Sequence, residues 1–313
     1  MIISASRRTD IPAFYSDWFF NRIQEGYAMV RNPMNYHQVS KIVLTPDVVD
    51  CIVFWTKNPA PMLNRIEELK EYNYYFQFTL NSYAKDIEPN VPVKDKEVIS
   101  TFKSLSSKIG KGRIIWRYDP ILLSDRYTID YHIKYFEKIA DSLNGFFEHC
   151  VISFVDVYKK ITNNIRCNSI REPNGADIDT IARRFAEIAR DRGFKIVSCA
   201  EKVDLYEYGI EHGKCIDDNL IESIIGLPLK INKDKNQRIE CGCVESIDIG
   251  LYNTCLHGCK YCYANYSDVS VASNTKLYDV NSPLLCSQLS SEDNVTVRDV
   301  SSLCDGQLRL SDY

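Results

Sequence analysis

Three cysteines close together in the last fifth of the chain are the residues best suited to chemistry. Cys255, Cys259 and Cys262 have the spacing C-x3-C-x2-C, with Tyr261 directly before the last cysteine. Three thiolates on one short loop can hold three irons of a cubane cluster. The fourth iron then has no protein ligand and stays open to bind a small molecule. The spacing therefore predicts a [4Fe-4S] cluster on this loop.

A second pair of cysteines leaves a different metal site open. Cys241 and Cys243 flank a single glycine just upstream of the loop. With Cys259 and Cys262 they can make the four-thiolate site of a structural zinc ion. They can also hold an auxiliary cluster, or no metal at all. The alternative hypothesis is thus a zinc-binding barrel protein, acting as a hydrolase or as a binding domain.

Composition narrows the class of protein. The chain has 313 residues, of which 45% are hydrophobic, so its length and composition allow one large α/β domain or two small ones with a sizeable core. A net charge of −4 gives no general attraction to nucleic acid or to an anionic membrane. We find no secretory signal and no apolar run of about 18 residues. Twelve cysteines then indicate a reducing, cytoplasmic compartment, with thiols and metal rather than disulfides.

Apolar, strand-like runs alternate with helical patterns along the chain. The expected strands are Ile2–Ser6, Val49–Trp55, Tyr74–Leu80, Arg113–Arg117, Cys150–Val155, Lys195–Cys199 and Ile247–Ile249. The expected helices are Ser16–Tyr27, Pro61–Glu71, Asp95–Ile109, Thr128–Leu143, Asp177–Arg192 and Leu220–Ile225. Repeated β-then-α units predict an α/β fold, a full or partial parallel β/α barrel of TIM type. A doubly wound sheet is the alternative.

We expect this barrel to occupy residues 1–265, with the cysteine loop at its C-terminal end. Residues 266–313 are rich in Ser, Asp and Asn and predict a loosely structured extension, with a docked segment such as Pro283-Leu284-Leu285. Of the scattered cysteines, Cys51, Cys150 and Cys199 lie in or beside apolar strands. They are expected to be small core residues.

Polar side chains follow the expected strands, where β/α barrels carry their chemistry. They are Arg7, Arg8, Asp10, Trp55, Lys57, Arg117, Asp119 and Glu201. An arginine can grip a carboxylate with two hydrogen bonds, and an acidic group can take an ammonium. Trp55 or Tyr118 can stack on an adenine ring, and Lys57 can hold a substrate anion or transfer a proton. The residue types together suit an aminoacyl ligand in one barrel mouth.

The cysteine loop resembles that of radical S-adenosylmethionine (SAM) enzymes, whose pattern is C-x3-C-x-aromatic-C after the first strand of a β/α barrel. Here the strand before the loop, Ile247–Ile249, is the last one. A circular permutation accounts for this order, because the termini of such domains lie close together. Ile247–Ile249 would then lie beside Ile2–Ser6, and Ser6–Asp10 would adjoin Cys255–Cys262.

The whole chain is similar to an uncharacterised prokaryotic family, a domain of unknown function. The stretches that carry this resemblance are Ser6–Pro12, Phe54–Pro59, Trp116–Pro120, Cys241–Cys243 and Cys255–Asn265. Its cysteine loop is similar to that of radical SAM members of the spore-photoproduct-lyase kind. The chain departs from that superfamily in placing the loop last and in lacking a Gly-Gly-Glu-Pro-like segment. Backbone carbonyls of Ser4–Ser6 would have to replace the usual contact to the amino group of SAM.

The resemblance implies a cofactor set. Cys255, Cys259 and Cys262 would hold a [4Fe-4S] cluster whose open iron chelates SAM, with Tyr261, Trp55 and Glu201 among the residues that contact the cofactor. Reduction by a ferredoxin or flavodoxin would give a 5′-deoxyadenosyl radical that acts on an unknown substrate. Repair of nucleic acid is a further possibility, which the acidic balance and the lack of a basic run disfavour.

Overall fold

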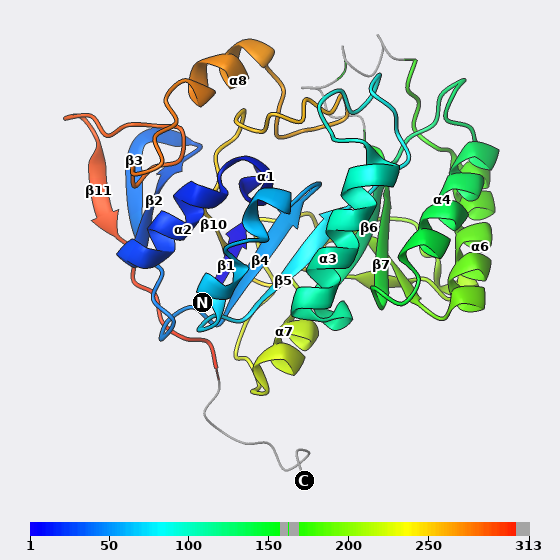
Figure 1. Ribbon diagram of the computed structural model, residues 1–313, viewed down its shortest axis with the longest axis horizontal. Coiled ribbons are helices and arrows are strands. Elements are labelled where there is room, and N and C mark those ends of the chain that lie inside the picture. Colours follow the sequence, from blue (N-terminus) through cyan, green and yellow to red (C-terminus); the bar gives the residue numbers. More distant parts are fainter. Residues whose placement is uncertain (157–161, 163–168, 305–313) are drawn as a thin grey trace.

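The computed structural model describes residues 1–156, 162 and 169–304, and an eight-stranded parallel sheet forms its centre (Figure 1). In spatial order the strands are β10 (Ile247–Asp248), β1 (Ile2–Ala5), β4 (Cys51–Thr56), β5 (Tyr74–Thr79), β6 (Ile114–Ile121), β7 (His149–Phe154), β8 (Lys195–Cys199) and β9 (Glu211–Gly213). Every pair of neighbours is parallel. The order is open, with β10 and β9 at the two edges. The predicted fold class, a partial TIM-like β/α barrel, is confirmed.

The described helices lie along the central sheet and, in the case of the last one, in the C-terminal segment. They are α1 (Ile11–Phe14), α2 (Ser16–Glu25), α3 (Ile99–Ile109), α4 (Ile129–Leu143), α6 (Gly175–Arg192), α7 (Asp218–Ile225) and α8 (Asp268–Thr275). In Figure 1, α3, α4 and α6 line one face of the sheet. The carboxyl ends of the parallel strands form the mouth of the sheet, and α7 lies at the opposite end. A π-helical turn, Lys94–Val98, leads into α3.

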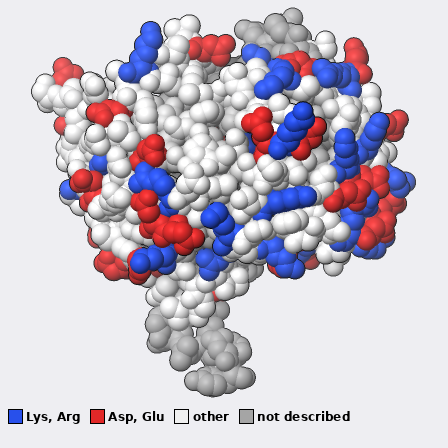
Figure 2. Space-filling model, in the orientation of Figure 1, with Lys and Arg blue, Asp and Glu red and all other residues white. Residues whose placement is uncertain are grey.

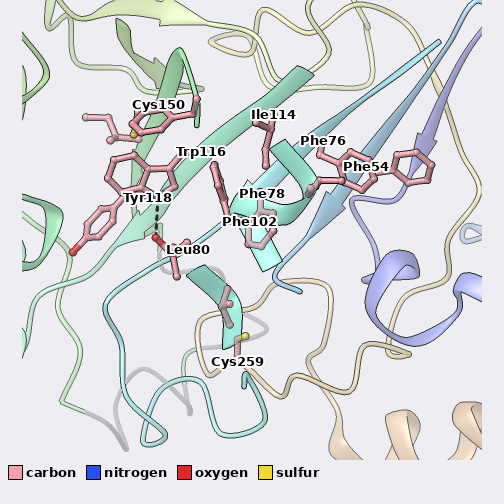
Figure 3. Close-up of a cluster of buried hydrophobic side chains, with 14 of the residues drawn as sticks. Phe54, Phe76, Phe78, Leu80, Phe102, Ile114, Trp116, Tyr118, Cys150 and Cys259 are labelled. Carbon is pink, nitrogen blue, oxygen red and sulfur yellow. Dashed lines mark hydrogen bonds between the residues drawn. The ribbon is translucent and has the colours of Figure 1, made fainter. Parts of the chain in front are cut away.

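Both faces of the central strands are buried, which explains their continuous apolar sequences. On the helix-covered face, aromatic side chains of neighbouring strands pack together (Figure 3), as in the stacked rings of Phe54 and Phe76. The Trp116 indole stacks on Phe136 of α4 and donates its N–H to the Leu80 carbonyl at 3.0 Å. Alternate residues of the strands form a second, smaller cluster on the other face. This rigid sheet sets the positions of the loops at its mouth.

The strand before the cysteine loop lies beside the N-terminal strand. Parallel pairing of β10 with β1 aligns Ile3 with Ile247 and Ser4 with Asp248. The two strands are separated by more than 240 residues in the sequence. The spatial order expected from a circular permutation is therefore confirmed.

Two local predictions were wrong. The helix α2 ends at Glu25, because Gly26 adopts the left-handed conformation (φ 74°), and a hairpin of β2 (Tyr27–Asn32) and β3 (Asn35–Val43) follows it. In place of the helix Pro61–Glu71 the chain forms two 3-10 turns, Ala60–Met62 and Ile66–Leu69. Such turns also repeat every three residues, so the apolar spacing still reaches the core.

The C-terminal segment is better ordered than its composition indicates. It contains α8 and the strand β11 (Asn294–Val297), which pairs in parallel with β3. The predicted docked segment is confirmed, since Leu284 and Leu285 are 2% and 3% exposed. Residues 305–313 lie outside the described part of the chain, and the division at residue 265 stays a prediction.

Candidate functional site

Asp10 connects three segments at the mouth of the sheet. Its Oδ1 accepts the N–H of Ala13 at 3.0 Å and so caps α1. Its Oδ2 accepts the backbone N–H of Lys57 at 2.7 Å and lies 2.9 Å from His257 Nε2. His257 belongs to the cysteine loop. The predicted adjacency of Ser6–Asp10 and Cys255–Cys262 is confirmed, and Asp10 holds it together.

Asp248 makes a second connection, which sequence reasoning missed. Its carboxylate accepts hydrogen bonds from the hydroxyls of Ser4 at 2.7 Å and Ser6 at 2.6 Å. It also accepts the N–H groups of Arg7 at 2.8 Å and Gly250 at 3.0 Å. The end of β10 and the end of β1 are thus fixed to one another. In the sequence, Asp248 is marked only as an acidic residue inside a short apolar strand.

Glu88 is the centre of a buried charge network, also missed. Its side chain is 1% exposed, and it pairs with the ammonium groups of Lys57 (2.8 Å) and Lys94. The hydroxyl of Tyr261 donates to the same carboxylate. Burial alone would raise the pKa of Glu88, but the two lysines hold it well below its usual range. Lys57 is therefore engaged in positioning Tyr261, next to Cys262.

The segment around Glu88 forms a wall against the cysteine loop. Asn90 donates its side-chain N–H to Leu256 O at 2.8 Å and its backbone N–H to His257 O at 3.2 Å. Lys260 N–H donates to the Ile87 carbonyl at 3.0 Å. Gly258 has φ 68°, and a Cβ there would lie 3.3 Å from Pro89 Cγ. The loop conformation is thus set by its contacts with the segment around Glu88.

Two cavities open at this mouth. The smaller, of 160 Å³, is lined by Cys255, Cys259 and Cys262 together with Arg8 and Asp10. The larger, of 290 Å³, lies beside it. Their shared lining residues are Arg7, Trp55, Lys57, Thr79 and Tyr261. Most of the predicted site residues therefore meet in one region. A third cavity, of 370 Å³, lies at the other end of the strands, lined by Ile115, His149 and Lys195, where we expect no chemistry.

The smaller cavity suits a cofactor with thiolate ligands. Thr9 Oγ1 and His257 Nδ1 are buried beside it and have no hydrogen-bond partner among the described residues. Burial raises the pKa of all three thiols, to about 12 for Cys259, so the positive charge of a bound metal would have to stabilise them as thiolates. Across the described residues, no three His, Cys, Asp or Glu side chains converge as ligands of a single ion. A cubane does not require that convergence, because each of its thiolates binds a separate iron.

Three of the predicted residues have other partners. Arg117 pairs with Asp119 and donates to Gln77 Oε1 at 3.1 Å, so its guanidinium is engaged inside the barrel. The Glu201 carboxylate accepts the N–H of Phe154 at 2.8 Å and lines neither mouth cavity. Burial, followed by the nearby charge of Asp156, raises the pKa of Glu201 to about 7. A cofactor contact by Glu201 gains no support from this position.

Cys241 and Cys243 have neighbours other than those of the zinc hypothesis. They line the larger cavity with Cys199 and Cys215, and Cys243 interacts with Cys215 and with Cys241. Cys51 and Cys150 are fully buried core residues as predicted. Cys199 is half-buried and packs against the smaller hydrophobic cluster, with its sulfur 2.9 Å from that of Cys215.

Comparison with known proteins identifies the family. A family described as a domain of unknown function, DUF1848, matches residues 2–264. The chain belongs to this family. No curated protein sequence matches the chain. A solved structure described as that of a proposed α-L-fucosidase from Bacteroides thetaiotaomicron is 12% identical, and the match covers 72% of this chain and 82% of that one. Its TM-score is 0.26, so it carries no argument about this protein.

The surface adds two observations. Lys and Arg side chains alternate with Asp and Glu on the face that Figure 2 shows, and no large area of one sign dominates it. Within the described part of the chain, no helix is both long and apolar enough to cross a membrane. The family description names no activity. The residues at the mouth of the sheet are therefore the basis for a proposed function.

Proposed function

We propose that this DUF1848 protein is an iron–sulfur enzyme of the radical SAM type, with a substrate still to be identified. The observation that carries the proposal is the place of the three-cysteine loop. It leaves the carboxyl end of β10 beside β1 and lines a cavity with Arg8 and Asp10. When bound, a cluster reduced by a ferredoxin or flavodoxin supplies the electron that cleaves SAM to methionine and a 5′-deoxyadenosyl radical.

Cys255, Cys259 and Cys262 are the proposed cluster ligands. The loop that carries them is held by Asp10 through His257 and by Asn90 through two backbone carbonyls. Ligands already fixed in place lose less conformational freedom when the cluster assembles. Lys57 and Glu88 hold Tyr261, and Tyr261 in turn forms part of the wall between the two cavities.

Arg8 is the proposed partner of the SAM carboxylate. It lines the smaller cavity and lies over the Tyr252 ring, and one N–H reaches the Gly250 carbonyl at 3.4 Å. A guanidinium held in this way can offer its remaining donors to a carboxylate. The hydroxyl of Thr9 can accept a hydrogen bond from the ammonium group. Asp10 is less suited to binding the amino group of SAM, because its carboxylate oxygens already accept hydrogen bonds from Ala13, Lys57 and His257.

The larger cavity is the proposed substrate site. It shares Arg7, Trp55 and Tyr261 with the smaller one, so a molecule held there would lie beside the cofactor. Its charged lining residues are already paired, Lys57 with Glu88, Arg7 with Asp234 and Asp119 with Arg117. These paired groups favour a small polar substrate that can share their hydrogen bonds. The Arg7 guanidinium lies 5.7 Å from the ring centre of Trp55, and both residues line the two cavities.

The test is anaerobic reconstitution with iron and sulfide, followed by iron and sulfide analysis and electron paramagnetic resonance after reduction. We expect about four irons at the loop, lost separately in Cys255→Ser, Cys259→Ser and Cys262→Ser. Cys150→Ala removes a buried thiol on β7 and should keep the cluster. Loop variants that retain the full cluster signal would overturn the proposal.

A further inference from the structure

Four cysteines from three distant segments meet at the larger cavity. Cys199 ends β8, Cys215 follows β9, and Cys241 and Cys243 lie on a later loop; all four line the cavity. The sulfurs of Cys199 and Cys215 are 2.9 Å apart, and Cys243 contacts both Cys215 and Cys241. The chain of contacts therefore includes every member. The three cysteines of the 255–262 loop line the other cavity.

Two glycines allow these segments to approach. A Cβ on Gly213, the last residue of β9, would lie 2.5 Å from Val197 Cγ2, so only glycine lets β9 pack this closely on β8. That approach brings Cys215 to Cys199. A Cβ on Gly242 would lie 3.0 Å from Lys214 Cγ, so the glycine between Cys241 and Cys243 lets their loop pack on the residue before Cys215.

Positive groups and an N–H donor face the sulfurs. The Arg117 Nη1 donates to Cys215 Sγ at 2.9 Å, and the Ile216 N–H donates to Cys243 Sγ at 3.4 Å. Arg7 is close enough to interact electrostatically with Cys215 and Cys243. Cationic neighbours and N–H donors favour thiolates, the form that binds metal. Of the four sulfurs, those of Cys215 and Cys243 accept these hydrogen bonds.

We propose that Cys199, Cys215, Cys241 and Cys243 are the ligands of one thiophilic divalent metal ion of the Zn²⁺ kind. Four thiolates without a vacant position are the donor set of a closed, structural site. The short contacts favour a single ion, because the thiolates of a cubane bind separate irons and lie further apart. The site does not depend on a cluster at Cys255, Cys259 and Cys262.

Metal binding requires a small rearrangement. Tetrahedral thiolates around zinc have sulfurs about 3.8 Å apart, given Zn–S bonds of about 2.3 Å. Cys199 and Cys215 are closer than that, and in the described residues the four sulfurs do not yet have the spacing of a metal site. Binding would separate these two sulfurs and release thiol protons to solvent. It would then join β8, β9 and the 241–243 loop beside the substrate cavity.

The experiment uses the full chain, purified under reducing, metal-free conditions and titrated with Co²⁺ and then Zn²⁺. We expect one equivalent of Co²⁺ to give the thiolate charge-transfer band and the intense d–d bands of a tetrahedral site, with Zn²⁺ abolishing both. Cys215→Ser and Cys243→Ser should each weaken Co²⁺ binding at least about tenfold. Cys150→Ala, as the matched control, should bind Co²⁺ as the parent does, and Cys255→Ser reports any Co²⁺ held by the other cysteine loop.

A measurement on the unmutated protein guards against variants that fail to fold. Zn²⁺ should protect Cys199, Cys215, Cys241 and Cys243 together from alkylation, as read by mass spectrometry, and should not change the alkylation rate of Cys255. Three results would each overturn the proposal. They are a protein that binds no Co²⁺, Co²⁺ absorption bands that disappear in Cys255→Ser rather than in the Cys215 and Cys243 variants, and a Cys199–Cys215 disulfide in place of bound metal. Iron and sulfide held by these four thiols in place of one ion would overturn it too.

Discussion

Buried carboxylates hold the mouth of this protein together. Asp10, Glu88 and Asp248 each accept hydrogen bonds from segments far apart in the chain. Asp10 could be selected from the sequence because it follows the first strand. Its role could not, since its partners Lys57 and His257 lie 47 and 247 residues away. Residue type and strand position thus predict which side chains gather, whereas their hydrogen-bond partners depend on the tertiary fold.

Glu201 gives a prediction about pH. Its pKa is raised to about 7 mainly by burial, so the fold disfavours its ionised form. The wild-type free energy of unfolding should therefore fall as pH rises from about 4.3 to about 7. Glu201→Gln stays neutral and should remove this part of the pH dependence. The variant should thus gain stability relative to wild type between pH 5 and pH 8 in urea unfolding.

The exposed Glu71 provides the control. Glu71→Gln should leave the pH dependence of the unfolding free energy as it is in the wild type. If the stability of Glu201→Gln followed the wild-type curve across this range, the burial argument for Glu201 would be wrong.

At the scale of elements, the strands were predicted better than the turns. The apolar runs placed seven of the eight strands of the central sheet, all but the three-residue β9. The hairpin of β2 and β3 was missed because Tyr27 was assigned to the preceding helix. The positive φ of Gly26 ends that helix. In the sequence, a glycine that follows charged residues in the last helical turn indicates such an end.

Gly250 tests how the end of β10 meets the end of β1. A Cβ at this position would lie 2.1 Å from Ser6 Oγ and 2.6 Å from Ser6 Cβ. Gly250→Ala should lower the free energy of unfolding by about 1–3 kcal/mol, as overpacking does. It should also reduce iron uptake, because the cysteine loop begins nearby.

Gly175→Ala is the matched control for chemical denaturation. Gly175 begins α6, and no atom lies within 4 Å of the Cβ it would gain. Equal stability of the two alanine variants would show that β1 and β10 do not need the close approach at Gly250.

For the whole molecule, the permuted order could be predicted and the wrapping of the C-terminal segment could not. A cysteine loop on the last strand has to lie beside the first strand if the barrel is to have one mouth, and β10 does pair with β1. The segment after residue 265 instead returns to the hairpin, where Met29 N–H donates to the Pro283 carbonyl at 2.8 Å. Such pairing across some 250 residues leaves no periodic pattern in the sequence.

Leu285 tests whether this returning segment is part of the core. The residue is 3% exposed and belongs to the main hydrophobic cluster. Leu285→Ala should cost about 2–5 kcal/mol of unfolding free energy. Leu289→Ala, at a position 44% exposed, should change it by about 0.5 kcal/mol or less. A negligible effect at both positions would mean that the segment is an appendage, independent of the barrel.

The reaction at the cysteine loop is the central part of the proposed function. The most direct measurement is the formation of 5′-deoxyadenosine by the anaerobically reconstituted protein after dithionite reduction in the presence of SAM. We predict that the product appears with the unmutated protein and with Cys150→Ala, and that Cys259→Ala abolishes it. A protein that holds its full complement of iron and sulfide, yet neither binds SAM nor forms 5′-deoxyadenosine, would contradict the proposed function.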